Sequence, residues 1–278
     1  MTLGRFGFVD PSRQRCQAMK IARFETDLTD AQWLLIEPLL PPPSRLGRPR
    51  TPLRPVVDAL LYLLKSGCPW RLLPKNFPPW KTVYHFFWNW SRGPIFCGLN
   101  ARLRALVRES EGKRCRPTAA ALDSQTVRSA AHGGAVGYDP GKRTKGRKRF
   151  LLVDTLGMIL GAAVVPANET ERSGAKVLLK PLLGWFPWLQ KIWVDSGYCG
   201  PDFAAWVREQ RPKLEIEVIK RSDDLRGFHV LPKRWIVERT FAWLVQNRRL
   251  ARDYEQSKAS ATGLLYVAMI RLMLRRLA

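Results

Sequence analysis

The chain has 278 residues, of which 46% are hydrophobic, so it is neither a disordered nor a collagen-like sequence. Its 47 Lys and Arg outnumber its 23 Asp and Glu, which gives a formal net charge of +24 and argues against an ordinary enzyme of small metabolites. Such a charge favours a polyanionic partner, most commonly nucleic acid, although a basic ribosome-associated protein or a membrane-surface protein is the alternative.

Cysteine content and hydropathy narrow the class further. Five scattered cysteines and three histidines show no metal-ligand spacing, so we expect neither a disulfide framework nor a structural zinc site. No apolar run reaches the length of a membrane span, and the start lacks the order of a signal peptide, so we expect a cytoplasmic protein without membrane contact. Residues 1–22 are polar and basic without apolar periodicity, and we expect a disordered leader in which Met19 is an alternative start.

Residues 23–115 predict an all-helical domain. Thr29 or Asp30 can cap its first helix, which the three prolines from Pro41 end. Further helices are predicted by apolar residues at helical spacing over 55–65, 80–90 and 99–110. A tight turn rich in Pro and Trp joins the first two of these, an arrangement that suits a helix-turn-helix reader of duplex DNA.

The pattern changes in residues 116–255, which predict a second domain built from strands and helices. We expect, in order, strands over 119–127, 150–154 and 158–166, a helix over 170–183, a strand over 191–195, a helix over 201–209, a strand over 214–220 and a helix over 233–248. A hairpin followed by strand–helix alternation predicts an α/β fold with a mixed sheet flanked by helices, in the order of the ribonuclease-H-like fold. Residues 256–278 predict a final apolar helix with a basic tail.

Three acidic residues stand among apolar neighbours rather than in polar loops. Asp123 lies within the first predicted strand, Asp195 ends another strand, and Glu238 lies in the helix predicted over 233–248. A carboxylate in such surroundings is costly unless it is paired or binds a metal. If the two aspartate strands are neighbours, the three carboxylates can meet at one sheet edge, where an all-oxygen ligand set suits Mg²⁺ or Mn²⁺. An aspartate at a strand end is, alternatively, often only a turn or cap residue.

A basic stripe overlaps the end of the glycine-rich segment 133–146 and favours the metal-site interpretation. Six cations make up this stripe: Lys142, Arg143, Lys145, Arg147, Lys148 and Arg149. They would bind DNA phosphates beside the three acids, whereas a charge run is otherwise most often a solvated loop. Asp154, at the turn that follows, is expected to serve the predicted hairpin.

Seven blocks of the sequence are distinctive when they are taken together in order. They are Thr-Asp-Leu-Thr-Asp-Ala-Gln-Trp (26–33), Gly-Cys-Pro-Trp-Arg-Leu-Leu-Pro (67–74), Phe-Pro-Pro-Trp-Lys-Thr-Val-Tyr (77–84), Ala-Leu-Asp-Ser-Gln-Thr-Val (121–127), Lys-Gly-Arg-Lys-Arg-Phe-Leu-Leu-Val-Asp-Thr-Leu-Gly (145–157), Val-Asp-Ser-Gly-Tyr (194–198) and Trp-Ile-Val-Glu-Arg-Thr-Phe-Ala-Trp-Leu (235–244). This set resembles the bacterial insertion-sequence DDE transposases of the insertion-sequence-five type. The resemblance covers about residues 24 to 257.

The resemblance implies a ribonuclease-H-like catalytic core in which Asp123, Asp195 and Glu238 hold two Mg²⁺ or Mn²⁺ ions. It implies action on double-stranded DNA, at the terminal inverted repeats of the element and at target DNA. The implied chemistry is phosphodiester hydrolysis at the transposon end, followed by transesterification in which the freed 3′-hydroxyl attacks target DNA.

The family pattern around the glutamate is matched only in part. Arg234 lies four residues before Glu238 on the same helix face and would pair with it or hold a phosphate, while an ordinary salt bridge is the alternative. Leu231 and Val245 stand where the family has a tyrosine and a basic residue. Two basic residues further along would substitute for the latter: Arg248 and Arg249.

We therefore expect a transposase that pairs two DNA ends as a homodimer, at the nucleoid in the bacterial cytoplasm. The apolar helix 264–277 is a candidate dimer surface or, alternatively, part of the protein's own core. Tyr198 would stack on a base near the cut or is simply a packed neighbour. Two other functions stay open, namely a ribonuclease-H-like nuclease that cuts without joining and a catalytically silent DNA-binding repressor derived from a transposase. An RNA-binding ribosome-associated factor is a weaker alternative.

Overall fold

A computed structural model gives the structure of the chain and describes residues 24–43, 49–130, 134–219, 233 and 235–278. The expected leader over residues 1–22 lies outside the described residues, as does Arg234. The helices are α1 (Asp30–Ile36), α2 (Leu53–Ser66), α3 (Trp80–Arg92), α4 (Ile95–Ser110), α5 (Glu171–Leu182), α6 (Pro201–Gln210), α7 (Trp235–Val245) and α8 (Lys258–Leu277). The strands are β1 (Ala119–Arg128), β2 (Gly137–Asp139), β3 (Thr144–Asp154), β4 (Ile159–Pro166), β5 (Lys191–Val194) and β6 (Glu215–Val218).

The first helix begins where the sequence predicts, at a capping box. The Thr29 hydroxyl accepts a hydrogen bond from the Gln32 amide at 3.1 Å, and the Gln32 side chain accepts one from the Thr29 amide at 3.3 Å. These two bonds satisfy amide groups that the first turn of a helix leaves without partners. The second helix, α2, ends at Gly67, whose φ of 72° is a left-handed conformation that glycine adopts without strain.

The sheet is mixed, as the order of predicted elements indicates. Its strands lie in the order β2-β3-β1-β5-β6, and β4 pairs with β3. β1, β2 and β4 run antiparallel to β3, whereas β5 is parallel to both β1 and β6. An antiparallel meander followed by parallel strands with helical connections is the ribonuclease-H-like arrangement expected from the sequence.

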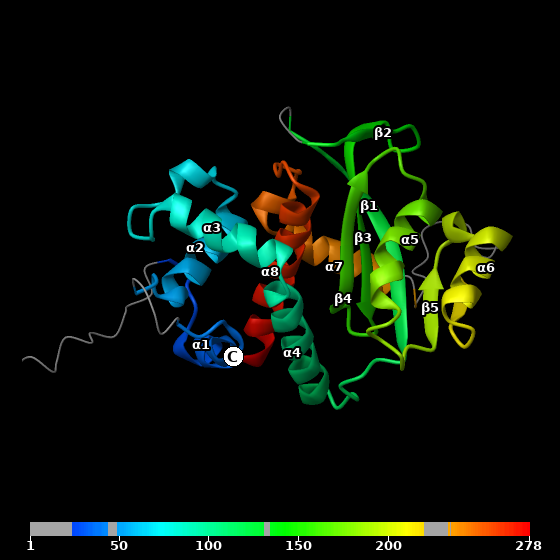
Figure 1. Cartoon of the computed structure of the whole chain (residues 1–278), viewed down its shortest axis with the longest axis horizontal. Coiled ribbons are helices and arrows are strands. Elements are labelled where there is room, and N and C mark those ends of the chain that lie inside the picture. The colour runs from blue at the N-terminus through cyan, green and yellow to red at the C-terminus, as the bar shows by residue number, and fades with distance from the viewer. Residues whose placement is uncertain (1–23, 44–48, 131–133, 220–232, 234) are drawn as a thin grey trace, which may run out of the picture.

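Helices cover both faces of the sheet and form two hydrophobic cores (Figure 1). On one face, α5 and α6 pack on the even-numbered positions of β1 and β3, such as Leu122 and Phe150. On the other face, α7 and α8 pack on the odd-numbered positions, such as Ala121 and Leu151. Side chains alternate between faces along a strand, so the parity of a position decides which core it enters. The core under α7 and α8 is continuous with the hydrophobic core of α1–α4.

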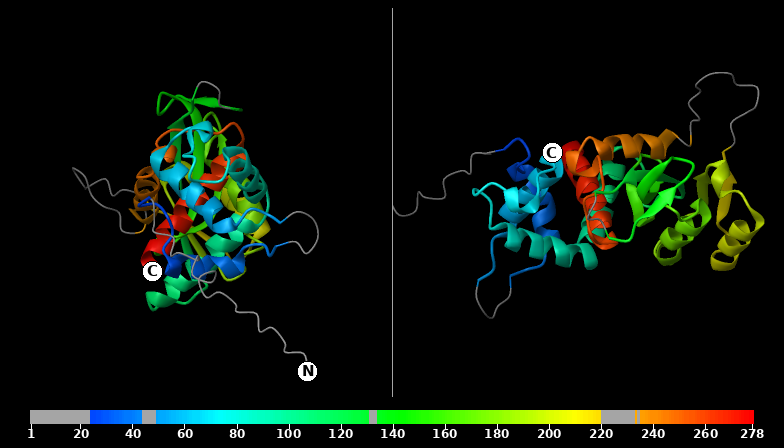
Figure 2. Two further views of the ribbon diagram at one scale, coloured as in Figure 1. Left: turned by 90° about the vertical axis from the view of Figure 1, so that its left-hand side faces the viewer. Right: turned by 90° about the horizontal axis from the view of Figure 1, so that it is seen from above.

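The C-terminal helix lies inside this larger core rather than on the surface. Leu265, Met269 and Met273 of α8 are fully buried, and α8 contacts α2, α3, α4 and β4 (Figure 2). The Tyr266 hydroxyl accepts a hydrogen bond from the Ala162 amide of β4 at 3.3 Å. Of the two hypotheses for this helix, a dimer surface or part of the protein's own core, its position in the structure agrees with the second. No helix in the described part of the chain is long and apolar enough to cross a bilayer.

The hairpin between β3 and β4 is fixed by Asp154, as the sequence predicts. The buried carboxylate accepts hydrogen bonds from the Leu156 and Met158 amides, each at 2.9 Å. It also pairs with Arg108 of α4 at 2.8 Å, a buried ion pair that no sequence pattern indicated. This contact joins the helical region to the sheet.

Candidate active site

The two predicted catalytic aspartates lie at the same level on neighbouring strands. β1 and β5 are parallel, and Ala121 pairs with Trp193 in their register. Asp123 is two residues beyond Ala121, and Asp195 is two residues beyond Trp193. Because side chains repeat their direction every second residue, the strand positions of both aspartates belong to the face on which α7 packs. Adjacent strands are separated by about 4.8 Å, so the structure brings these two residues to one sheet edge.

Asp195 sits where the sheet ends and a 3-10 turn begins. Its Oδ1 accepts a hydrogen bond from the Gly197 amide at 2.9 Å, so it also caps this turn. In β1, the Asp123 Oδ1 accepts a hydrogen bond from the Ser124 amide at 2.7 Å. Both aspartate side chains are half-buried.

The third predicted acid, Glu238, lies in the first turn of α7 and is exposed. This helix packs on β1 and β3 through a buried face that includes Val237 and Phe241. Its position is set by the hairpin, because the Thr240 hydroxyl donates to the Gly157 carbonyl at 2.9 Å. The helix that carries Glu238 therefore crosses the sheet face to which the two aspartate positions belong. Among the described residues, no group of three His, Cys, Asp or Glu side chains is gathered closely enough to hold a metal ion.

A further acid, Glu171, reaches the same edge from the opposite face. Its Oε2 accepts hydrogen bonds from the Ser124 hydroxyl at 2.6 Å and from the Tyr198 hydroxyl at 3.3 Å. Its Oε1 pairs with Lys148 at 3.0 Å. Glu171 follows the N-cap of α5, where an acidic residue is common, so no sequence signal separated it from an ordinary helix start.

Tyr198 is buried beside these acidic residues. The ring is buried, and this burial, together with the negative charges of Asp123, Glu171 and Asp195, raises the pKa of its hydroxyl far above the ordinary value. The sequence left open whether Tyr198 stacks on a DNA base or packs internally. Because only 1% of the residue is exposed, the structure places it as an internal neighbour of the carboxylates.

The basic stripe divides into an exposed half and a buried half. Three of its cations are exposed at and beside the turn between β2 and β3, namely Lys142, Arg143 and Lys145. The Asp139 carboxylate holds this turn by accepting a hydrogen bond from the Lys142 amide at 3.0 Å. Burial alone would raise the pKa of Asp139, but hydrogen bonds from Thr126 and Lys142 and the charge of Lys148 outweigh it, and the pKa is lowered.

The other half of the stripe lies inside the protein, because it belongs to strand β3 rather than to a loop. Arg147 has no exposed surface and contacts Asp253 at 3.0 Å, the Glu255 carbonyl at 2.8 Å and the Gln256 carbonyl at 2.8 Å. The Arg149 guanidinium donates to the Leu250 carbonyl at 2.7 Å, and burial lowers its pKa to about 10. These two residues therefore hold segment 250–256 against the sheet, and the expected DNA contact is not compatible with the burial of Arg147.

The remaining predicted DNA-binding residues also differ from one another. Lys148 is 7% exposed, and its ammonium group pairs with Glu171 and donates to the Glu169 carbonyl. It therefore holds Glu171 in place inside the protein. Arg249 is buried and pairs with Glu255 at 2.7 Å, which removes it as a substitute for the family's basic residue. Arg248 is exposed beside the end of α2 and stays available for that role.

Comparison with known proteins identifies the family. Residues 114–273 match the family described as "Transposase DDE domain", and residues 28–100 match "Putative transposase of IS4/5 family". The chain belongs to the DDE transposases of the IS4/5 type. It is 30% identical over 120 residues to the "Insertion element IS402 uncharacterized 16.2 kDa protein" of Burkholderia cepacia, covering 41% of this chain and 80% of that protein. It is 32% identical over 106 residues to "Uncharacterized protein y4sN" of Sinorhizobium fredii, covering 38% and 78% respectively.

Proposed function

We propose that this transposase-family chain binds the terminal inverted repeats of its element and catalyses metal-dependent strand cleavage followed by strand transfer. The observation that best supports this activity is the placement of Asp123 and Asp195 at equivalent levels of adjacent parallel strands, with both positions belonging to one sheet face. Two carboxylates in this relation suit a phosphoryl-transfer site far better than an isolated cap residue does.

We propose that Asp123 and Asp195 hold two Mg²⁺ or Mn²⁺ ions, and that Glu238, from the helix that packs on the same sheet face, is the third ligand. The donor chemistry is suitable, because all three ligands are carboxylates. When bound, the ions would neutralise the charge that develops on the phosphate and assist both the attacking and the leaving oxygen. Glu171 and Ser124 would keep β1, and with it Asp123, in position to bind these ions.

The exposed hairpin between β2 and β3 would grip the DNA away from the cut. Leu151 lies opposite Asp123 in the β1–β3 pairing, and Arg143 is eight residues from Leu151 along the chain. Eight strand residues span about 26 Å, which corresponds to roughly eight base pairs of B-DNA. Lys142, Arg143 and Lys145 would therefore hold the backbone nearly one helical turn from the reacting phosphate.

The test is incubation of the purified full chain with Mg²⁺ and a duplex that carries its own flanking inverted repeat, beside the Asp123→Asn variant. Nicking at the repeat end that requires the metal and is lost in the variant is the expected result. Joining of a pre-cut 3′-hydroxyl end to a second duplex would distinguish a transposase from a nuclease. Tight repeat binding without cleavage in either protein, at any metal concentration, would contradict the proposed chemistry and favour a repressor.

A further inference from the structure

A groove of about 580 Å³ lies between α5 and α6 on the opposite face of the sheet from α7. Its size is in the range of sites that hold small molecules or single nucleotides, which is about 300–1,000 Å³. The lining includes Thr170, Arg172, Lys176, Lys180, Asp202 and Trp206. The groove thus combines a cationic wall with an aromatic surface, and its described lining has three cations and one acid.

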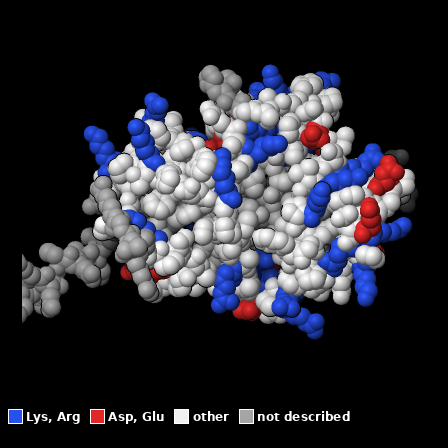
Figure 3. All heavy atoms as spheres, viewed as in Figure 1, with Lys and Arg blue, Asp and Glu red and all other residues white. Residues whose placement is uncertain are grey.

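The cations form one row along α5. Arg172, Lys176 and Lys180 are four residues apart, which places them on one face of the helix over a length of about 12 Å. That length equals roughly three nucleotide steps at the B-form spacing of a single strand. Figure 3 shows basic side chains crossing the surface over α5 beside α6.

The aromatic side of the groove comes from α6. Trp206 is partly exposed and stacks on the buried Phe203, with ring centroids 6.3 Å apart and planes 18° apart. The Lys176 ammonium lies 5.7 Å from the Trp206 ring. A nucleotide at this place would therefore meet a phosphate partner and a stacking surface together.

The groove starts at the catalytic edge. Thr170 and Arg172, at its end, flank Glu171, which contacts Ser124 and Tyr198 beside the aspartates. The Arg172 guanidinium also packs against Gly200, where an added Cβ would lie only 2.7 Å from its Nη1 atom. A DNA strand leaving the aspartates on this side would enter the row of cations directly.

We propose that this groove binds single-stranded DNA, namely the unpaired nucleotides next to the cut, with phosphates on the α5 row and a base on Trp206. This inference rests on the proposed function for its biological setting. A duplex does not fit the same chemistry, because its bases are stacked on one another and present no free face to Trp206. A charged row beside an aromatic platform is the usual design of single-strand sites.

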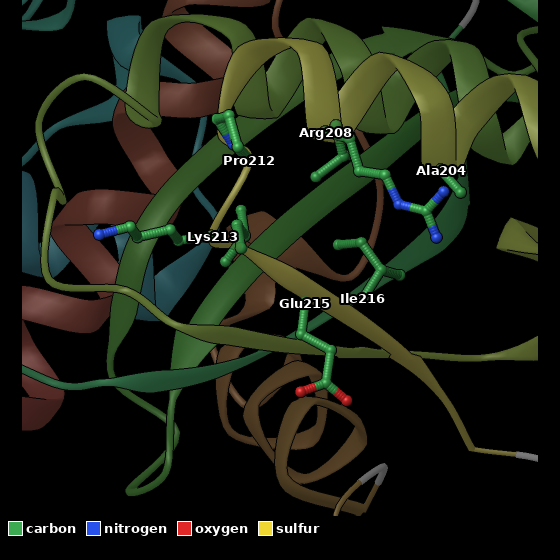
Figure 4. A pocket seen from close by; sticks show the side chains of 8 residues that line it. Ala204, Arg208, Pro212, Lys213, Glu215 and Ile216 are labelled. Carbon is green, nitrogen blue, oxygen red and sulfur yellow. The ribbon is translucent and has the colours of Figure 1, made fainter.

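The test measures binding of a fluorescent 12-nucleotide oligothymidylate to the full chain by anisotropy, in EDTA and over a range of salt concentrations. The Lys176→Gln/Lys180→Gln variant is compared with Arg208→Gln/Lys213→Gln, which removes two cations from a different pocket between α6 and β6 (Figure 4). Loss of two single-strand phosphate contacts should reduce the slope of log K against log salt by about 1.4 in the groove variant. The slope of the control variant should be unchanged.

Stacking is tested separately at Trp206. Trp206→Leu should weaken oligothymidylate binding at least about fivefold, as loss of one stacked base does, while Trp206→Phe retains most of the affinity. If Trp206→Leu does not fold, the lysine pair still decides the outcome. Equal weakening by the groove and control pairs, or equal loss of single-strand and blunt-duplex binding, would overturn the proposal.

The groove and the proposed chemistry fail in different ways. Asp123→Asn should bind oligothymidylate like the wild type in EDTA, because the groove needs neither metal nor catalysis. Intact single-strand binding with no cleavage of repeat ends would therefore remove the proposed function alone. Cleavage with no effect of the lysine pair on oligothymidylate binding would remove the groove alone.

Discussion

Replacement of Arg147 by methionine should destabilise the protein strongly without a specific effect on DNA contacts. The guanidinium is fully buried and makes four contacts, the fourth being with the Ala135 carbonyl at 3.1 Å. Methionine fills a similar volume but leaves the buried Asp253 carboxylate without its cation. Removing one member of a buried ion pair costs about 3–5 kcal/mol. Asp253 keeps weaker contacts with Ser129 and the Glu255 amide, which favours the lower end of that range.

The assay is thermal unfolding followed by circular dichroism, together with DNA binding of the folded variant at low temperature. A loss of about 3–5 kcal/mol should lower Tm by roughly 6–20 °C in a chain of this size. The matched control is Lys145→Met, two residues earlier in β3 but exposed. Its stability should change by less than about 0.5 kcal/mol. Its salt slope for duplex binding should fall by about 0.9 if Lys145 makes one phosphate contact.

The opposite pattern would refute the reasoning. If Arg147→Met melts with the wild type and loses duplex affinity, then Arg147 contacts DNA as the sequence pattern suggested. If both variants melt early by the same amount, the division of the stripe into a buried half and an exposed half is wrong.

Four further predictions concern the edge, the hairpin, acid stability and the groove. Glu171→Gln weakens the contact with Lys148 and should slow cleavage of repeat ends, measured on gels. Its affinity for the duplex, measured by anisotropy, should stay within twofold of the wild type. Equal loss of cleavage rate and duplex affinity would contradict a positioning role for Glu171. Gly157→Ala places a Cβ 2.8 Å from the Thr240 hydroxyl at a φ of 85°, and should cost about 1–3 kcal/mol in urea unfolding. Hydrogen bonds from Lys233 and Lys191 lower the pKa of Glu217 from 4.5 to about 2. The ionised carboxylate therefore stabilises the fold fully above pH 4.5, and this stabilisation is lost as pH falls toward 2. Glu217→Gln should flatten that part of a Tm–pH curve. Asp202→Asn should strengthen oligothymidylate binding, because it removes the acid of the groove lining, and weaker binding would count against the site.

The fold and the acidic pair were predictable because each rests on local patterns with few alternatives. Short apolar segments located β1 and β5. The hypothesis that these two strands are neighbours, which would bring Asp123 and Asp195 to one sheet edge, agrees with their parallel pairing. The capping box at Thr29 and the turn at Asp154 are likewise short-range signals. In each of these cases the interacting atoms are close in sequence, or they are related by strand periodicity alone.

The buried cations were not predictable, because their partners lie far away in the sequence. Arg147 pairs with Asp253 across 106 residues, and Arg108 with Asp154 across 46. A run of positive charge favours a solvated loop unless distant carboxylates and carbonyl groups can compensate its burial. The same limit applies to Glu171, whose contact with Ser124 depends on how α5 packs on the sheet. The sequence shows that a cation is present at a position, but it does not show which distant acid pairs with it.

The burial of α8 has a consequence for the order in which the protein can be made. The Gln32 side chain donates a hydrogen bond to the carbonyl of Ala278, just after α8, at 3.0 Å, and α8 completes the core shared by α2, α3 and α4. On the ribosome, domains usually fold from the N-terminus as they emerge. Here α2, α3 and α4 must wait for α8, which begins 148 residues after α4 ends (258 − 110), before their apolar faces are covered. A chain interrupted before α8 would expose those faces to proteases, so an incompletely translated copy should be degraded rather than persist as a DNA-binding fragment.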